Sequence, residues 1–178
     1  FWREGKRIEL TYDQAGWTRA VELMNATDIV KAQKDIELTI DALKALPNHE
    51  GGVASIGYCF GGTGALEAAR GGLNVAGVVS FHGGLGKAED RNTTTIRPRV
   101  LVLHGADDPF VPEKEVLAFQ NEMKAAKADW QMIYYANAVH SFTNKAFNSL
   151  ASSGFILPPS INLNCLRRSA PSKSRCSY

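Results

Sequence analysis

Short apolar runs that alternate with segments of helical periodicity restrict the fold of this chain more than any other feature. Four runs have the length and continuity of buried strands, and they cover residues 53–58, 75–81, 100–103 and 130–135. Because the segments between them carry helical signals, crossovers should join these strands and make them parallel. The sequence therefore predicts an α/β fold with a mostly parallel sheet, covered on both faces by helices in three αβα layers.

Three segments carry helical signals. The first covers about residues 28–46, where apolar side chains recur at spacings of three and four and Thr27 is placed to cap the helix. The second covers residues 61–70. The third begins at Pro112, and its expected inward face consists of Val116, Phe119 and Met123.

The composition is that of a globular protein and excludes several classes of partner. Hydrophobic residues make up 44% of the chain and charged residues 21%, which suits one domain with one core. A net charge of +2 is too small to indicate a nucleic-acid or membrane partner, and no apolar run approaches the roughly 20 residues that span a bilayer. The three cysteines cannot all pair, which favours a reducing compartment. We therefore expect a cytoplasmic monomer that binds a small molecule.

Residues 151–178 differ in character from the rest of the chain. Serine is frequent there, three prolines interrupt the segment, and its four basic residues have no acidic counterpart. Without those four the chain has 16 basic and 18 acidic residues, so this tail supplies the positive net charge. We expect residues 1–150 to form the folded domain, as a fragment that starts at Phe1 without a methionine. The Ser-rich basic tail is expected to be disordered or out of frame, without function.

The segment Gly57-Tyr58-Cys59-Phe60-Gly61 has the pattern of a nucleophile elbow between a strand and a helix. Side chains at positions 57 and 61 are expected to collide with the adjoining strand and helix. The turn should aim the sulfur out of the sheet and place the Phe60 N–H, at the helix N-terminus, where an oxyanion would form. A lone cysteine is more often a small buried apolar residue, but the flanking glycines favour a nucleophile here.

Position along the chain selects the base among four histidines. In folds with this elbow the order is nucleophile, acid, histidine, and only His140 lies beyond the other two. His49 falls in a polar turn, where a solvated surface histidine is expected. His82 and His104 end predicted strands, where they would line the cleft or, as we favour, satisfy local backbone groups.

Two aspartates are candidates for the acid. Asp107 and Asp108 follow the predicted strand 100–103, and a carboxylate in that loop can orient His140 and stabilise its cationic form. Both are also suited to turns or helix caps, and Asp107 fits that alternative well.

Four of these segments together resemble the dienelactone hydrolase family. They are Gly57–Gly62, Phe81–Leu85, Asp108–Pro112 and Val139–Phe142, and the resemblance extends from about Gly5 to Phe142. It implies hydrolysis of a small ester or lactone, such as a carboxymethylenebutenolide, through a thioester and without a cofactor or metal.

The resemblance also assigns roles by position. Cys59 is then the nucleophile, Asp108 the acid because it immediately precedes Pro-Phe-Val-Pro, His140 the base, and the Phe60 amide an oxyanion donor. Lys145 stands where the type enzymes carry an arginine that grips the substrate carboxylate. The residues expected to contact the substrate are Tyr58, His82, Phe110, Phe142 and Lys145.

Some parts of the family pattern would lie upstream of Phe1. They are the first strands, a second oxyanion donor and a carboxylate that pairs with the resting thiol, so we expect a fold that is incomplete at the N-terminus. One alternative is therefore a catalytically incomplete fragment that acts as a binding or interaction domain through exposed sheet surface. Another is a thiol redox sensor, although Cys59 has no neighbouring resolving cysteine in the sequence.

Overall fold

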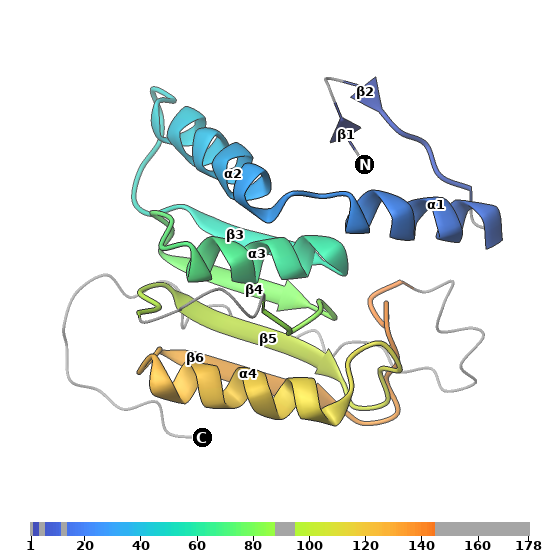
Figure 1. Ribbon diagram of the computed structural model, residues 1–178. Coiled ribbons are helices and arrows are strands. Elements are labelled where there is room, and N and C mark those ends of the chain that lie inside the picture. The colour runs from blue at the N-terminus through green and yellow to red at the C-terminus, as the bar shows by residue number, and fades with distance from the viewer. Residues whose placement is uncertain (1, 4–5, 12–13, 88–94, 145–178) are drawn as a thin grey trace.

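The computed structural model describes residues 2–3, 6–11, 14–87 and 95–144. A four-stranded sheet forms its centre, with the order β3-β4-β5-β6 (Figure 1). All three strand pairs are parallel. The strands are β3 Ala54–Tyr58, β4 Gly77–Phe81, β5 Arg99–Gly105 and β6 Trp130–Tyr135. The predicted α/β class with a parallel sheet flanked by helices is therefore confirmed.

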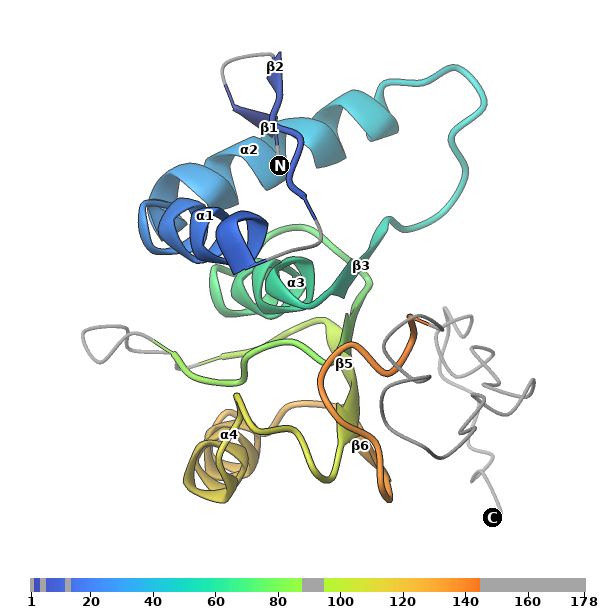
Figure 2. The same cartoon turned by 90° about the vertical axis from the view of Figure 1, so that its right-hand side faces the viewer.

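Helices α2, α3 and α4 lie on one side of this sheet, as the view along the sheet shows (Figure 2), so they supply one of the two helical layers that the sequence predicted. The helices are α1 Gln14–Asn25, α2 Ile29–Lys44, α3 Phe60–Arg70 and α4 Glu113–Ala125. Two short antiparallel strands, β1 Trp2–Arg3 and β2 Lys6–Arg7, precede them. The sequence patterns predicted neither these two strands nor α1. No helix within the described residues combines the length and apolarity required to cross a membrane.

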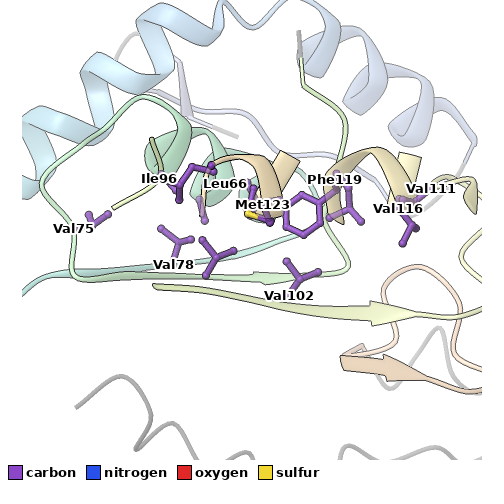
Figure 3. Close-up of a cluster of buried hydrophobic side chains, with 14 of the residues drawn as sticks. Leu66, Val75, Val78, Ile96, Val102, Val111, Val116, Phe119 and Met123 are labelled. Atoms are coloured by element: carbon purple, nitrogen blue, oxygen red, sulfur yellow. The ribbon is translucent and has the colours of Figure 1, made fainter. Parts of the chain in front are cut away.

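Alternation along the strands divides the core into two clusters. Val78 and Val102 point to the helical side, where they meet the apolar faces of α3 and α4 (Figure 3), and Val100 belongs to the same cluster. Val79 and Leu101 belong to the cluster on the opposite face. Because successive strand residues face opposite ways and both faces are covered, these strands have continuous apolar sequences. The predicted inward face of α4, formed by Val116, Phe119 and Met123, is buried.

The start of α2 differs from the prediction. Asp28 caps the helix, and its carboxylate accepts hydrogen bonds from the backbone N–H groups of Val30 at 2.8 Å and Lys31 at 3.1 Å. Thr27 instead donates its hydroxyl to the Leu23 carbonyl at 2.8 Å, at the end of α1. Because a second helix ends immediately before α2, Thr27 belongs to the first and the next residue caps the second. The helix also ends at Lys44 rather than near residue 46.

A buried arginine joins α3 to α4 and to the segment after β4. Arg70 is 1% exposed at its side chain and forms ion pairs with Glu67 at 3.0 Å and Glu122 at 2.8 Å. Its guanidinium also donates to the carbonyl oxygens of Leu85 at 2.7 Å and Gly86 at 3.0 Å. These bonds hold the segment that continues from the carboxyl end of β4 against the helical layer.

Candidate active site

Cys59 lies at a sharp turn between β3 and α3. Its φ of 51° and ψ of −121° are strained for a residue with a side chain. A Cβ at Gly57 would lie 1.9 Å from the Gly61 carbonyl oxygen, and one at Gly62 would lie 2.7 Å from Ser80 Oγ. A Cβ at Gly61 would meet no atom within 4 Å. The prediction of a collision is therefore correct at position 57 and wrong at position 61, because the start of α3 faces open space there while position 62 packs against β4.

Three loops at the carboxyl end of the sheet bring three side chains together. Cys59 follows β3, Asp108 follows β5 and His140 follows β6. The Nε2 atom of His140 is 3.0 Å from Cys59 Sγ, and its Nδ1 is 2.9 Å from Asp108 Oδ2. Since a carboxylate only accepts, Nδ1–H donates to Asp108 and Nε2 faces the sulfur. This continuous row has the geometry of a nucleophile, a base and an orienting acid.

Asp108 and Asp107 have different environments. The Asp108 side chain is fully buried, and its Oδ1 accepts a hydrogen bond from the Phe110 N–H at 2.9 Å. Asp107 is exposed. The structure therefore brings to His140 the aspartate that the family resemblance selects.

The electrostatics of this row favour an ion pair between thiolate and imidazolium. The hydrogen bond with His140 lowers the pKa of Cys59 below its ordinary 9.0 against the opposing effect of burial, with a further contribution from the Phe60 backbone. Burial alone would lower the pKa of His140, but hydrogen bonds with Asp108 and Cys59 outweigh it and raise the value to about 9. Burial also opposes ionisation of Asp108, yet its hydrogen bonds with His140 and Phe110 hold its pKa below the ordinary value.

His82 lies directly beneath this row rather than on its surface. It is 3% exposed, and its Nδ1 accepts a hydrogen bond from the Cys59 N–H at 3.2 Å. Its Nε2 is 2.8 Å from Thr143 Oγ1. The ring makes edge contacts with the rings of His140 and Phe142, with centroids 5.3 Å and 5.2 Å apart. With both ring nitrogens engaged, His82 does not present a polar atom to a substrate, contrary to the expectation of substrate contact; it satisfies a backbone N–H instead.

Known proteins share the sequence pattern and the fold of this chain. The profile of the dienelactone hydrolase family matches residues 6–153. The chain belongs to the dienelactone hydrolase family. A solved dienelactone hydrolase-like promiscuous phosphotriesterase from metagenomic libraries is 39% identical, with a TM-score of 0.65 over 78% of this chain and 58% of that one. A solved protein named m3DLH is 35% identical, with a TM-score of 0.70 over 88% of this chain and 64% of that one.

A curated relative points in the same direction. The carboxymethylenebutenolidase of a Pseudomonas species is 26% identical over 172 residues, which cover 96% of this chain and 71% of the relative. The predicted family and the predicted class of carboxylic-ester and lactone hydrolase agree with these findings. The chain spans less than two thirds of the length of the two solved structures.

Two aromatic side chains of this family member flank the row and remain open to solvent. Tyr58 is 53% exposed and stacks on Phe81 with ring centroids 4.6 Å apart. Phe110 is 58% exposed and makes an edge contact with the His140 ring at 5.1 Å. Phe142, also expected at the substrate, is 3% exposed because it packs into the core against Tyr135. The first two side chains are therefore available to a ligand, and the third is not.

The remaining expected residues lie elsewhere. Lys145 lies outside the described residues, as does the predicted tail 151–178. His49 is half-buried rather than solvated, and its Nε2 has no hydrogen-bond partner within the described part of the chain. His104 is 2% exposed, and its Nδ1 likewise has none there, so this nitrogen does not satisfy a local backbone group. The described residues contain no cluster of three His, Cys, Asp or Glu side chains suited to a metal ion.

A groove of about 600 Å³ lies between α2 and α3. Phe60 and Gly61 line it, but Cys59, Asp108 and His140 do not. The groove therefore lies beside the elbow, next to Phe60, and does not reach the three side chains of the row. We do not assign the substrate to it.

Sequence reasoning missed the part played by Thr143. This residue stands three positions after His140, and nothing in its local sequence distinguishes it. The His82-Gly83-Gly84 segment at the end of β4 could have indicated this role of Thr143. A histidine at the end of β4 is within reach of the loop after β6, because β5 pairs with both strands.

Proposed function

We propose that this chain hydrolyses a small ester or lactone, of the carboxymethylenebutenolide type, through Cys59, His140 and Asp108. The observation that carries the proposal is the continuous row of hydrogen bonds from Asp108 through His140 to Cys59. The family match and the carboxymethylenebutenolidase relative support the substrate class. A cytoplasmic, monomeric state stays a prediction.

The first half of the reaction forms a thioester. The Cys59 thiolate attacks the carbonyl carbon, a C–S bond forms, and the carbonyl electron pair moves to the oxygen. The Phe60 N–H at the start of α3 donates to that oxyanion. When the carbonyl re-forms, the C–O bond to the leaving oxygen breaks, and that oxygen takes the Nε2 proton of His140. For a lactone, the leaving oxygen remains attached to the same molecule.

The second half regenerates the thiol. Neutral His140 accepts a proton from a water molecule as the water oxygen attacks the thioester carbonyl. The tetrahedral intermediate then expels the Cys59 sulfur as a thiolate, which pairs again with the imidazolium. Asp108 accepts from Nδ1–H throughout and stabilises the cationic ring. Tyr58 and Phe110 supply apolar contact surface for the substrate beside the sulfur.

The experiment that tests this function is intact-protein mass spectrometry after brief exposure to 4-nitrophenyl acetate. We expect one acetyl adduct, mapped by peptides to Cys59 and lost on standing as the thioester hydrolyses. The Cys59→Ala variant, which leaves His140 and Asp108 in place, should acquire none. Equal labelling of Cys165 and Cys176, or full ester turnover by Cys59→Ala, would refute the mechanism.

A binding or interaction domain is the competing reading, and one observation favours it. Strand β3 lies at the edge of the described sheet, and Ile56 and Tyr58 on its outer face are 53% exposed each. Under this reading the chain forms no Cys59 adduct and binds a dye specific for exposed apolar surface. An adduct on a chain that melts cooperatively would exclude it.

Phosphotriesters are a second candidate substrate class, favoured by the 39% identity to a promiscuous phosphotriesterase. The same thiolate would attack phosphorus and expel an aryloxide. Exposure to diethyl 4-nitrophenyl phosphate should release 4-nitrophenolate and add one diethylphosphoryl group to Cys59. Release at the rate of the Cys59→Ala variant would exclude this activity.

A further inference from the structure

The nucleophile Cys59 and the base His140 lie on loops that follow two strands without direct contact. Cys59 follows β3 and His140 follows β6, the two outermost strands of the described sheet. Their Nε2···Sγ distance of 3.0 Å therefore depends on two loops whose strands share no ladder hydrogen bonds. A displacement of about 1 Å at a reacting centre can cost on the order of a hundredfold in rate.

His82 bridges these two loops from the end of β4, one of the two strands that lie between them. It follows β4, accepts from the Cys59 N–H through Nδ1 and faces Thr143 Oγ1 with Nε2. Because Nδ1 is the acceptor, the ring proton lies on Nε2 and is donated to Thr143. The Cys59 N–H also reaches the Phe81 carbonyl at 3.0 Å, so the nucleophile's own amide is shared between β4 and the ring that follows it.

The bridge requires a neutral imidazole. Burial, together with the positive charge of His140, lowers the pKa of His82 to about 4, so the ring is uncharged near neutral pH. Asp108 is the other charged group that acts on it, and it opposes this shift. A charged ring would carry a proton on Nδ1 and could no longer accept from the Cys59 amide.

The backbone at His82 has an uncommon conformation. Its φ of 40° lies in the left-handed region, which few residues other than Gly adopt and in which Asn, Asp and His are the most frequent of those few. A histidine that is 3% exposed in this conformation is held there by its surroundings.

We propose that His82 is a positioning residue that ties the Cys59 elbow to the His140 loop through Thr143, and so sets the distance between sulfur and imidazole. The proposal rests on the proposed function, because it assigns to that distance a role in forming the reactive thiolate. The ring nitrogens of His82 bond to the Cys59 backbone and to Thr143, not to the sulfur or to the His140 nitrogens.

The test compares Thr143→Val, His82→Asn and the double variant. Thr143→Val keeps the shape of the side chain and removes the hydroxyl. His82→Asn suits the left-handed backbone and can still accept from the Cys59 N–H through Oδ1, but it is too short to reach Thr143. The readouts are the rate of Cys59 alkylation by iodoacetamide as a function of pH, mapped by peptides, and kcat and KM for 4-nitrophenyl acetate.

Each single variant should raise the alkylation pKa of Cys59 and lower its alkylation rate at mildly acidic pH by about tenfold, with kcat reduced and KM near that of the wild type. Because both variants remove one link, the double variant should be no slower than His82→Asn alone. Thr143→Ser should restore the wild-type profile. Thr63→Val is the matched control, since it removes a hydroxyl whose hydrogen bond, to the Gly84 carbonyl at 3.3 Å, does not involve His82, and it should alkylate like the wild type.

Two results would overturn the proposal. One is a double variant whose loss is the product of the two single losses; the other is a Thr143→Val variant that behaves like Thr63→Val. If His82→Asn does not fold, the comparison of Thr143→Val with Thr143→Ser and Thr63→Val decides alone. Alkylation needs no substrate, so a wild-type chain that alkylates readily but hydrolyses no ester would refute the proposed function and leave this test intact.

Discussion

Two adjacent aspartates after β5 occupy opposite environments. Asp108 is buried and 2.9 Å from His140 Nδ1, whereas Asp107 is exposed. Asp108→Asn replaces a charged hydrogen-bond acceptor with an amide that can favour the wrong tautomer of His140. We expect kcat for an activated ester to fall by about 10²- to 10⁴-fold, with folding unchanged. Asp107→Asn is the matched control and should fall less than about twofold; a larger loss there would mean that the acid is misassigned.

The lowered pKa of Cys59 depends first on its hydrogen bond with His140. His140→Ala removes that bond and the charge of the histidine, so burial is then opposed only by the Phe60 backbone, and the pKa should rise towards its ordinary 9.0 or above. Alkylation by iodoacetamide near pH 6 should then slow by at least about tenfold, because only the thiolate reacts. His49→Ala, at a half-buried histidine outside the row, should leave the pH dependence of Cys59 alkylation unchanged. An unaltered profile in His140→Ala would contradict the ion pair.

At the scale of elements, the turn from β3 to α3 depends on Gly57 and not on Gly61. A Cβ at position 57 would overlap the Gly61 carbonyl at 1.9 Å, whereas one at position 61 meets no neighbour within 4 Å. We expect Gly57→Ala to cost about 3 kcal/mol or more of unfolding free energy. Gly61→Ala should change it by less than about 1 kcal/mol, because alanine favours the helix. Urea denaturation of the pair measures the difference, and equal losses would contradict the geometry of the elbow.

The contact between α3 and α4 depends on a buried charge cluster. Arg70→Ala would leave Glu67 and Glu122 buried without their partner, which costs about 3–5 kcal/mol. Arg99→Ala removes an ion pair with Asp129 whose side chains are 35% and 74% exposed, and it should cost less than about 1 kcal/mol. Thermal unfolding of both variants tests this contrast. A comparable loss in both would mean that the buried cluster contributes no more than a surface pair.

At the scale of the whole molecule, His82 makes folding sensitive to acid. In the unfolded chain its imidazole takes up a proton near pH 6.5, but in the folded chain only near pH 4. The stability associated with the neutral ring is therefore complete above about pH 6.5 and is lost as the pH falls through about 4, by up to about 3 kcal/mol. Urea denaturation near neutral pH and near pH 4 should show a larger drop for the wild type than for His82→Asn. Equal drops in both chains would refute this assignment.

The sequence by itself determined the parallel sheet and the segments that carry the candidate site. Continuous apolar runs such as the one through Val78 and Val79 indicate a strand covered on both faces, because alternate side chains pack on opposite sides. The glycine spacing around Cys59 reports a local backbone turn. Chain order singled out His140, and the resemblance to the dienelactone hydrolase family, through the Pro-Phe-Val-Pro segment, singled out Asp108. These are local patterns, or patterns of order, and they require no knowledge of which loops meet.

Only the tertiary structure decided which side chains face one another. Position 61 is open and position 62 is crowded because α3 packs on β4, a contact that no local pattern encodes. Phe142 is buried against Tyr135 rather than presented to a ligand. His82 meets both Cys59 and Thr143, at separations of 23 and 61 residues. Such contacts depend on strand order and register, which bring distant loops to the same end of the sheet. The sequence alone does not specify how close in space two such loops lie.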